Sequence, residues 1–332
     1  MGARIGAVAI GRNEGERLDK CLRSLVGVVG AVVYVDSGST DGSVELARGL
    51  GVTVVDLDTT IPFTAARARN AGFARLLEVA PDLEFVQFVD GDCEVAPEWI
   101  AAAGRAIDGD PQIAVVCGRR RERHPDASVY NRLCDLEWDQ PPGPTDACGG
   151  DALMRVAALR AVEGYDPSLI AGEEPELCLR LRRRGWKILR IAAEMTRHDA
   201  AMTRFGQWWR RMVRAGHAFA EVSTRHAGEP ERYWAKPTRS NWMWGVGLPV
   251  TSVALAAPSL GLSLNLLWLY GVLGARVYRS DRRRGFSAPD ARADAFFCVM
   301  SKFPQALGQM TYWRRRLTGS QGRLIEYKGP AT

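Results

Sequence analysis

The sequence is poor in the residues that build disulfide frameworks and zinc sites. Seven cysteines are scattered along 332 residues, and the chain has only 4 histidines. No two cysteines form a CxxC pair, so the pattern disfavours both kinds of site and is typical of free thiols in a reducing compartment. The N-terminus also lacks an apolar stretch long enough for a signal peptide. We therefore expect the first domain to stay in the cytoplasm.

A strong excess of charge is absent from most of the chain. Apolar residues make up 46% of the sequence and charged residues 25%, which is ordinary for a globular protein and excludes a disordered chain. Residues 276–332 are the exception, because they hold 12 Lys or Arg against 4 Asp or Glu. This distribution predicts an anionic partner for the C-terminal segment and disfavours a nucleic-acid-binding protein.

Short apolar runs alternate with segments of helical spacing along the first 120 residues. Strands are expected at residues 5–10, 31–35, 52–57, 85–89 and 113–117. This alternation predicts an α/β fold with a mostly parallel open sheet and flanking helices. In such sheets ligands bind at the carboxyl ends of the strands, where the acidic turns at Asp36 and Asp90 fall.

Two carboxylates directly follow one of these strands, in the run Asp90-Gly91-Asp92. Carboxylates two residues apart can share a divalent cation with a diphosphate, and Mg²⁺ and Mn²⁺ prefer oxygen ligands. An ordinary turn explains the pair equally well, since such turns are common without a ligand.

Three further segments carry groups suited to a nucleotide and a proton transfer. Asp36 can accept a hydrogen bond from an imide N–H such as that of uracil, although a capped turn is the alternative. An arginine in the run 67–69 can clamp phosphate, or it can lie on a solvated helix face. The acidic residues 173–176 can supply a general base, or they can simply favour a helix N-terminus.

The order and spacing of six segments are more specific than any one of them. These segments read AIGRNE, VDSGSTD, ARNAG, FVDGD, CGGDALMR and GEEPELCLRLRRRGW. Together they resemble the family 2 glycosyltransferases, over about residues 4–217. The resemblance implies a GT-A fold, which binds nucleotide-diphospho-sugars.

The resemblance also implies roles for individual residues. Those that hold the nucleotide-sugar would be Asn13, Glu14, Asp36, Arg69, Asn70 and Asp90. Asp92 would bind Mg²⁺ or Mn²⁺ together with His198. Glu174 would be the catalytic base with Glu173 beside it, where relatives carry a Glu-Asp pair. The acceptor side would include Gly150, Asp151 and Trp99.

These roles imply an inverting transfer of a single sugar. A UDP-sugar is the favoured donor because of Asp36. Processive synthases of the family carry a Q-x-x-R-W motif, whereas residues 207–211 here read QWWRR. The ingredients are present in another order, which favours addition of one sugar over polymer synthesis.

The composition changes sharply at residues 240–275, which include no formal charge. Basic residues flank this stretch on both sides, and Pro249 and Pro258 interrupt it. We expect a membrane-associated helical hairpin over residues 236–285, either re-entrant or as two short spans, with a buried apolar subdomain as the alternative. Residues 1–235 would be the GT-A catalytic domain. Residues 286–332 would be an amphipathic segment on an anionic membrane surface, with a helix packed on the catalytic domain as the alternative.

The leading hypothesis is therefore a glycosyltransferase at the cytoplasmic face of the inner (plasma) membrane. Its acceptor would be a lipid-linked or membrane-proximal glycan, as in bacterial exopolysaccharide or cell-envelope assembly. A sugar nucleotidyltransferase is one alternative, but the glycine-rich phosphate loop that it needs is poorly matched by GAVAIGRNE. A non-catalytic membrane scaffold is the other, which the carboxylates at 90, 92 and 174 disfavour.

Overall fold

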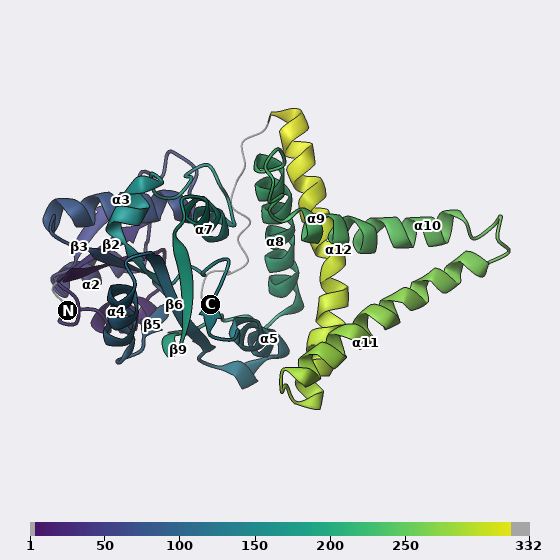
Figure 1. The fold of residues 1–332 in the computed structure, drawn as a ribbon, viewed down its shortest axis with the longest axis horizontal. Coiled ribbons are helices and arrows are strands. Elements are labelled where there is room, and N and C mark those ends of the chain that lie inside the picture. The colour runs from purple at the N-terminus through teal and green to yellow at the C-terminus, as the bar shows by residue number, and fades with distance from the viewer. Residues whose placement is uncertain (1–3, 320–332) are drawn as a thin grey trace. The chain divides into compact units, whose positions relative to one another are not determined.

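The computed structural model describes residues 4–319, which divide into two compact units (Figure 1). The first unit comprises residues 4–125 and 134–201, and the second comprises residues 126–133 and 202–319. The expected catalytic domain ran to residue 235. The boundary falls earlier because α8 (Phe205–Arg225) packs on α12 (Ala288–Thr318) within the second unit.

The first unit is built on a nine-stranded sheet in the order β3-β2-β1-β4-β8-β6-β9-β5, with β7 paired to β9. Its strands are β1 (Ile5–Gly11), β2 (Ala31–Asp36), β3 (Thr53–Asp56), β4 (Phe85–Asp90), β5 (Cys93–Val95), β6 (Ile113–Glu122), β7 (Gly143–Pro144), β8 (Ala152–Arg155) and β9 (Lys187–His198). Its helices are α1 (Glu16–Arg23), α2 (Ser43–Gly49), α3 (Ala65–Val79), α4 (Trp99–Gly109), α6 (Val156–Ala161) and α7 (Glu173–Arg183). A short 3-10 helix (Pro125–Ala127) and α5 (Val129–Trp138) lie where the chain passes between the units.

The sheet is mixed, which corrects the expectation of a mostly parallel one. β1, β2, β3 and β4 pair in parallel, as do β6 and β9. β8 runs antiparallel to both β4 and β6, and β5 and β7 run antiparallel to β9. The sequence analysis assigned no strand to residues 152–155, and this short strand is the one that reverses direction in the middle of the sheet.

The parallel half of the sheet brings the acidic turns together. Gly11 on β1 is level with Asp36 on β2, and Ile10 is level with Asp90 on β4. α3 lies close against these strands at Gly72, where a Cβ atom would stand 2.4 Å from Cγ1 of Val8. The glycine therefore lets α3 approach the sheet and hold its N-terminal turns at the carboxyl ends of the strands.

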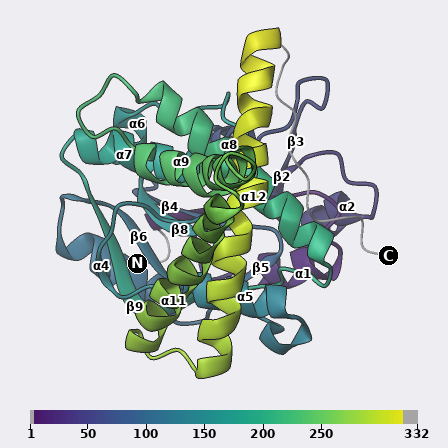
Figure 2. The ribbon, with the colours of Figure 1, turned by 90° about the vertical axis from the view of Figure 1, so that its right-hand side faces the viewer.

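The second unit is helical. After α8 it contains α9 (Ala235–Trp242), a π-helix (Met243–Gly247), α10 (Leu248–Ala254), a 3-10 helix (Leu262–Leu267), α11 (Trp268–Arg283) and α12. Figure 1 shows α12, in yellow, alongside α8, with α10 and α11 extending from it, and Figure 2 shows α11 beside α12. Glycines make this pairing close, because a Cβ atom at Gly308 would stand 2.0 Å from the Val213 carbonyl oxygen.

The uncharged stretch forms the expected hairpin, and its two arms touch. The Ser263 hydroxyl donates to the Ser252 carbonyl at 2.7 Å across the arms. Among residues 4–319, no helix is both long enough and apolar enough to cross a bilayer. Within the expected segment 286–332, residues 288–318 form α12, and those beyond 319 lie outside the described part of the chain.

Replacing Gly308 with Ala should destabilise the second unit, because the added methyl overlaps the α8 backbone. Overpacking of this kind costs about 1–3 kcal/mol. Gly271→Ala on α11 is the matched control, since a Cβ atom there meets nothing within 4 Å and alanine favours a helix. Thermal unfolding followed by circular dichroism compares the two. Equal midpoints would contradict the close approach at Gly308.

Candidate active site at the carboxyl ends of the strands

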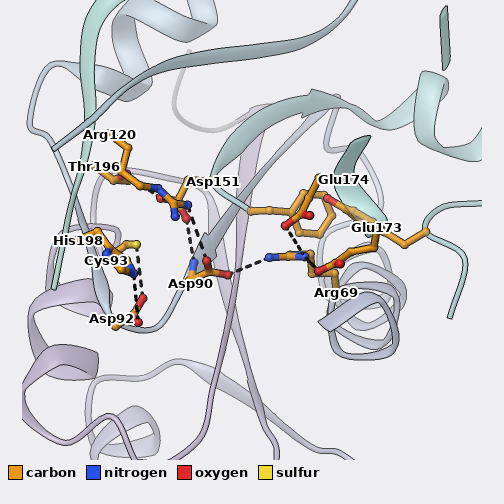
Figure 3. A network of polar contacts seen from close by, with 12 residues as sticks. Arg69, Asp90, Asp92, Cys93, Arg120, Asp151, Glu173, Glu174, Thr196 and His198 are labelled. Carbon is orange, nitrogen blue, oxygen red and sulfur yellow. Dashed lines mark hydrogen bonds and ion pairs between the residues drawn. The ribbon is translucent and has the colours of Figure 1, made fainter. Parts of the chain in front are cut away.

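A buried arginine on α3 joins three of the expected site residues. The Arg69 guanidinium lies 2.9 Å from Asp90 Oδ1, 2.9 Å from Glu173 Oε1 and 3.1 Å from Glu174 Oε1 (Figure 3). Its side chain is only 3% exposed. Burial opposes the charge of Arg69, but the three carboxylates more than offset it and raise its pKa. The Arg69 guanidinium therefore joins the end of β4, which carries Asp90, to the first turn of α7.

Glu174 has the pKa of a group that exchanges protons near neutral pH. Burial, followed by the neighbouring Glu173 carboxylate, raises the Glu174 pKa to about 7, against the opposing effect of Arg69. A carboxylate with such a pKa is well suited to general-base catalysis. The expected pair at 173 and 174 thus divides into a fully buried member and a partly exposed one.

Asp151 lies below the site rather than on its acceptor side. It is completely buried, accepts a hydrogen bond from the Asp90 backbone N–H at 3.0 Å and another from the Thr196 hydroxyl at 2.6 Å. Arg120 pairs with it at 2.7 Å (Figure 3). The expectation that Asp151 faces the acceptor is therefore wrong, because its carboxylate is used to fix the end of β4.

Arg120, Thr196 and Trp138 also belong to the site, although no sequence motif identifies them. Burial lowers the pKa of Arg120, but Asp151 and other anionic neighbours more than offset this and raise it. Arg120 lies over the Trp138 ring, 5.3 Å from the centroid, and the same ring meets the His198 ring edge-to-face. Arg120 stands between two further arginines in the sequence, so no local signal separates it from a solvated run.

A second group of ligands surrounds Asp92. Pairing of β5 with β9 sets Cys93 opposite His198, which brings the His198 ring Nε2 to 3.4 Å from Asp92 Oδ2 (Figure 3). Potential ligand atoms of Asp92, Cys93 and His198 all lie within 4.8 Å of one another. The Asp92 carboxylate is the kind of ligand that Mn²⁺ and Mg²⁺ prefer, and the His198 imidazole can serve as a further ligand.

Glycine at position 150 is required by the ion pair beneath it. A Cβ atom there would stand 2.7 Å from both Arg69 Nη2 and Asp90 Oδ2, and one at Gly149 would be 4.0 Å from Arg120. The loop backbone before β8 therefore passes directly over the Arg69–Asp90 pair. Gly150, expected on the acceptor side, forms part of this cover.

The expected nucleoside residues lie along the neighbouring strand ends. Asp36 is buried and accepts from the backbone N–H groups of Gly38 and Ser39 at 2.9 and 2.8 Å. Asn13, at a φ of 55°, accepts from the Thr40 N–H at 2.7 Å. These bonds join the turns after β1 and β2. They also show that the Asp36 carboxylate is engaged by its own turn.

Three expected residues have side chains with partners within the first unit. Glu14 pairs with Arg17 at 2.9 Å. The Asn70 side-chain amide is bonded at both ends to the backbone of Tyr165. Trp99 is completely buried and donates to Gln87 at 2.7 Å, so its placement on the acceptor side is wrong. A core indole cannot contact an acceptor.

Comparison with known proteins agrees with this geometry. Residues 9–161 match the model of glycosyl transferase family 2. The pre-mycofactocin glycosyltransferase of Mycobacterium tuberculosis is 27% identical over 173 residues, which cover 48% of this chain and 35% of that protein. The succinoglycan biosynthesis protein ExoA of Rhizobium meliloti is 27% identical over 187 residues, covering 52% and 54%. The chain thus spans about a third to a half of the length of these relatives.

A solved structure shares the fold over nearly the whole chain. The mannosyltransferase PcManGT from Pyrobaculum calidifontis, in complex with GDP-Man and Mn²⁺, superimposes with a TM-score of 0.62 at 16% identity. The alignment covers 94% of this chain and 88% of that one. The prediction from the sequence motifs is confirmed for this part of the chain: residues 9–161 match glycosyl transferase family 2, and the fold is a GT-A-like α/β fold.

Proposed function

We propose that this chain transfers one sugar from a nucleotide-diphosphate donor to a hydroxyl group, with inversion at the anomeric carbon. The observation that carries the proposal is the Arg69 cluster. It places a glutamate with a pKa of about 7 on the same guanidinium as Asp90, the first residue of the Asp90-Gly91-Asp92 turn. The proposed base Glu174 and the donor-binding carboxylate of Asp90 therefore pair with the same buried arginine.

On the donor side, Asp92 and His198 would hold a divalent cation. Bound there, the ion would neutralise charge on the diphosphate that leaves. PcManGT, which shares the fold, was solved with a nucleotide-sugar and Mn²⁺, and this supports the same ligand classes here. A UDP-sugar is the donor that the family resemblance of the Asp36 segment favours, and GDP- and dTDP-sugars are the other donors to test, because the bonds that Asp36 makes within its own turn do not distinguish them.

On the acceptor side, Glu174 takes the proton of the attacking hydroxyl. The acceptor oxygen bonds to the anomeric carbon from the face opposite the diphosphate, and the bond from that carbon to the diphosphate oxygen breaks. Arg69 orients both glutamates, and Glu173 keeps the Glu174 pKa high enough for the carboxylate to bind a proton near pH 7. Direct displacement of this kind inverts the configuration.

The acceptor that we propose is a lipid-linked or membrane-proximal glycan, at the cytoplasmic face of the plasma membrane. Two observations support it: the uncharged residues 240–275 with basic residues beside them, and the relative named for succinoglycan biosynthesis. Exopolysaccharide or cell-envelope assembly fits both. The family domain disfavours a sugar nucleotidyltransferase, and the intact carboxylate cluster disfavours a non-catalytic scaffold.

Glu174→Gln should lower turnover by about 10²–10⁴-fold, the usual contribution of a general base, and leave donor binding intact. Release of nucleoside diphosphate from UDP-, GDP- and dTDP-sugars with Mn²⁺ measures turnover, and thermal stabilisation by the matching nucleotide measures binding. Glu45→Gln, at the start of α2, is the control. Turnover within a few-fold of the unmodified protein would exclude Glu174 as the base.

The rate should depend on pH through the same residue. Only ionised Glu174 accepts a proton, so turnover should rise as the pH increases through about 7 and then level off. Glu173→Gln removes a neighbouring negative charge that raises the Glu174 pKa, so the rise in turnover with pH should occur at lower pH in this variant. Identical pH profiles of turnover in the two proteins would contradict the coupling between the two glutamates.

Nucleoside diphosphate should stabilise the protein against heat only when Mn²⁺ or Mg²⁺ is present. At 100 times its dissociation constant, a ligand specific for the folded state adds about 2.7 kcal/mol. The gain should disappear in Asp92→Asn and persist in Asp108→Asn on α4, which lies outside the ligand cluster. Stabilisation of equal size without a metal would reject the proposed role of Asp92.

A further inference from the structure

The hairpin of the second unit exposes an almost uninterrupted apolar surface. We call residues 240–275 the apolar hairpin. Leu260 at its tip is 94% exposed and Trp268 on its second arm is 77% exposed. Val250, Val253, Leu262 and Val272 are also exposed along the two arms. Surfaces of this kind on soluble proteins mark sites of association with a partner or a membrane.

Several polar groups of the apolar hairpin are bonded within it, whereas Thr251 and Asn265 are exposed. Ser252 donates to the Leu248 carbonyl, Ser263 donates to the Ser252 carbonyl, and the Tyr270 hydroxyl donates to the Trp244 carbonyl. The turn between the arms is bonded too, with the Gly261 N–H 2.7 Å from the Ala256 carbonyl oxygen. Internal pairing of this kind is what hydrocarbon surroundings demand, because lipid tails offer no partner for a backbone or hydroxyl group.

The two arms have the same length between their basic ends and the tip. The first runs as a continuous helix from Arg239 to Leu255, since Met243, Gly247 and Leu248 keep right-handed helical dihedrals. Its rise is about 24 Å at 1.5 Å per residue. The second arm, a 3-10 helix followed by α11 up to Arg276, also rises about 24 Å. The hydrocarbon core of a bilayer is about 30 Å thick.

Charge is confined to the base of the hairpin. Lys236 and Arg239 precede the first arm, and Arg276, Arg279 and Arg283 follow the second; all are exposed. No charged residue lies at the tip, where a crossing would need a group suited to the far headgroups. The charged end of the hairpin therefore complements the anionic headgroups on one face of a bilayer, and the uncharged tip is suited to the hydrocarbon core.

We propose that the apolar hairpin enters a lipid bilayer from one face and returns to the same face. Its tip would lie beyond the bilayer midplane and short of the opposite interface. The lysine and arginine side chains at the two ends of the hairpin would lie at the anionic headgroups. This inference goes beyond the proposed sugar transfer and does not depend on it. Vesicle binding and nucleotide release are measured separately, so either idea can fail while the other stands.

Flotation of the full chain with vesicles tests the insertion. The protein should float with phosphatidylcholine vesicles, and binding should strengthen when phosphatidylglycerol is added. Leu260→Asp should weaken binding at least tenfold, because a charge would enter hydrocarbon. Ile61→Asp is the matched control, since Ile61 is 50% exposed and belongs to the first unit, outside both the hairpin and the C-terminal segment. Absence of flotation, or equal loss in both variants, would overturn the proposal and favour a protein partner.

A label at the tip distinguishes return from crossing. A fluorophore on Leu260→Cys, in a Cys298→Ala background, should be quenched by lipids that carry a spin label deep in the acyl chain. Iodide outside the vesicle should not quench it, and a maleimide trapped inside should not react with the free thiol. Quenching by external iodide would show that the tip stays in water. Reaction with the trapped maleimide would show that the hairpin crosses. Either result would overturn the proposal.

Discussion

The active-site geometry depends on one buried positive charge. Arg69 holds Asp90, Glu173 and Glu174 within 3.1 Å, and three carboxylates this close could not all stay ionised without it. A buried cation with no anion would be equally costly, so each side of the cluster requires the other. The arginine thus pairs with three carboxylates in the structure, whereas its motif suggested a phosphate-binding role. Its positive charge determines the net charge of the site in the absence of substrate.

The fold supplies what that cluster needs from several distant parts of the chain. Parallel strands bring Asp90 next to the turn after β1, and the antiparallel strand β8 places Asp151 under the Asp90 backbone. α7 brings the glutamates, and the backbone at Gly150 covers the ion pair from above. The mixed sheet therefore matters for function, because a fully parallel one would not bring the start of β8 to this strand end.

The sequence predicted the parts of the site that have short motifs. Asp90, Asp92, Glu174 and the glycines before β8 stand in segments whose order is specific, and the structure brings them to one end of the sheet. The errors and omissions involve burial. Nothing in the sequence around Asp151 and Trp99 indicates that they are buried, and Arg120 lies within a run of three arginines. Helix α8 packs in the second unit through glycines whose contacts lie about 90 positions away in the sequence. None of these contacts has a local signature.

The absence of a side chain at Gly150 constrains how this protein can change over generations. Any larger residue there meets Arg69 and Asp90 at once, so it is tolerated only after the ion pair has been lost or moved. Loss of the pair in turn leaves two glutamates without their common cation. A larger residue at position 150 therefore requires Arg69 or Asp90 to move, and we expect the effects of substitutions at these three positions to depend on one another.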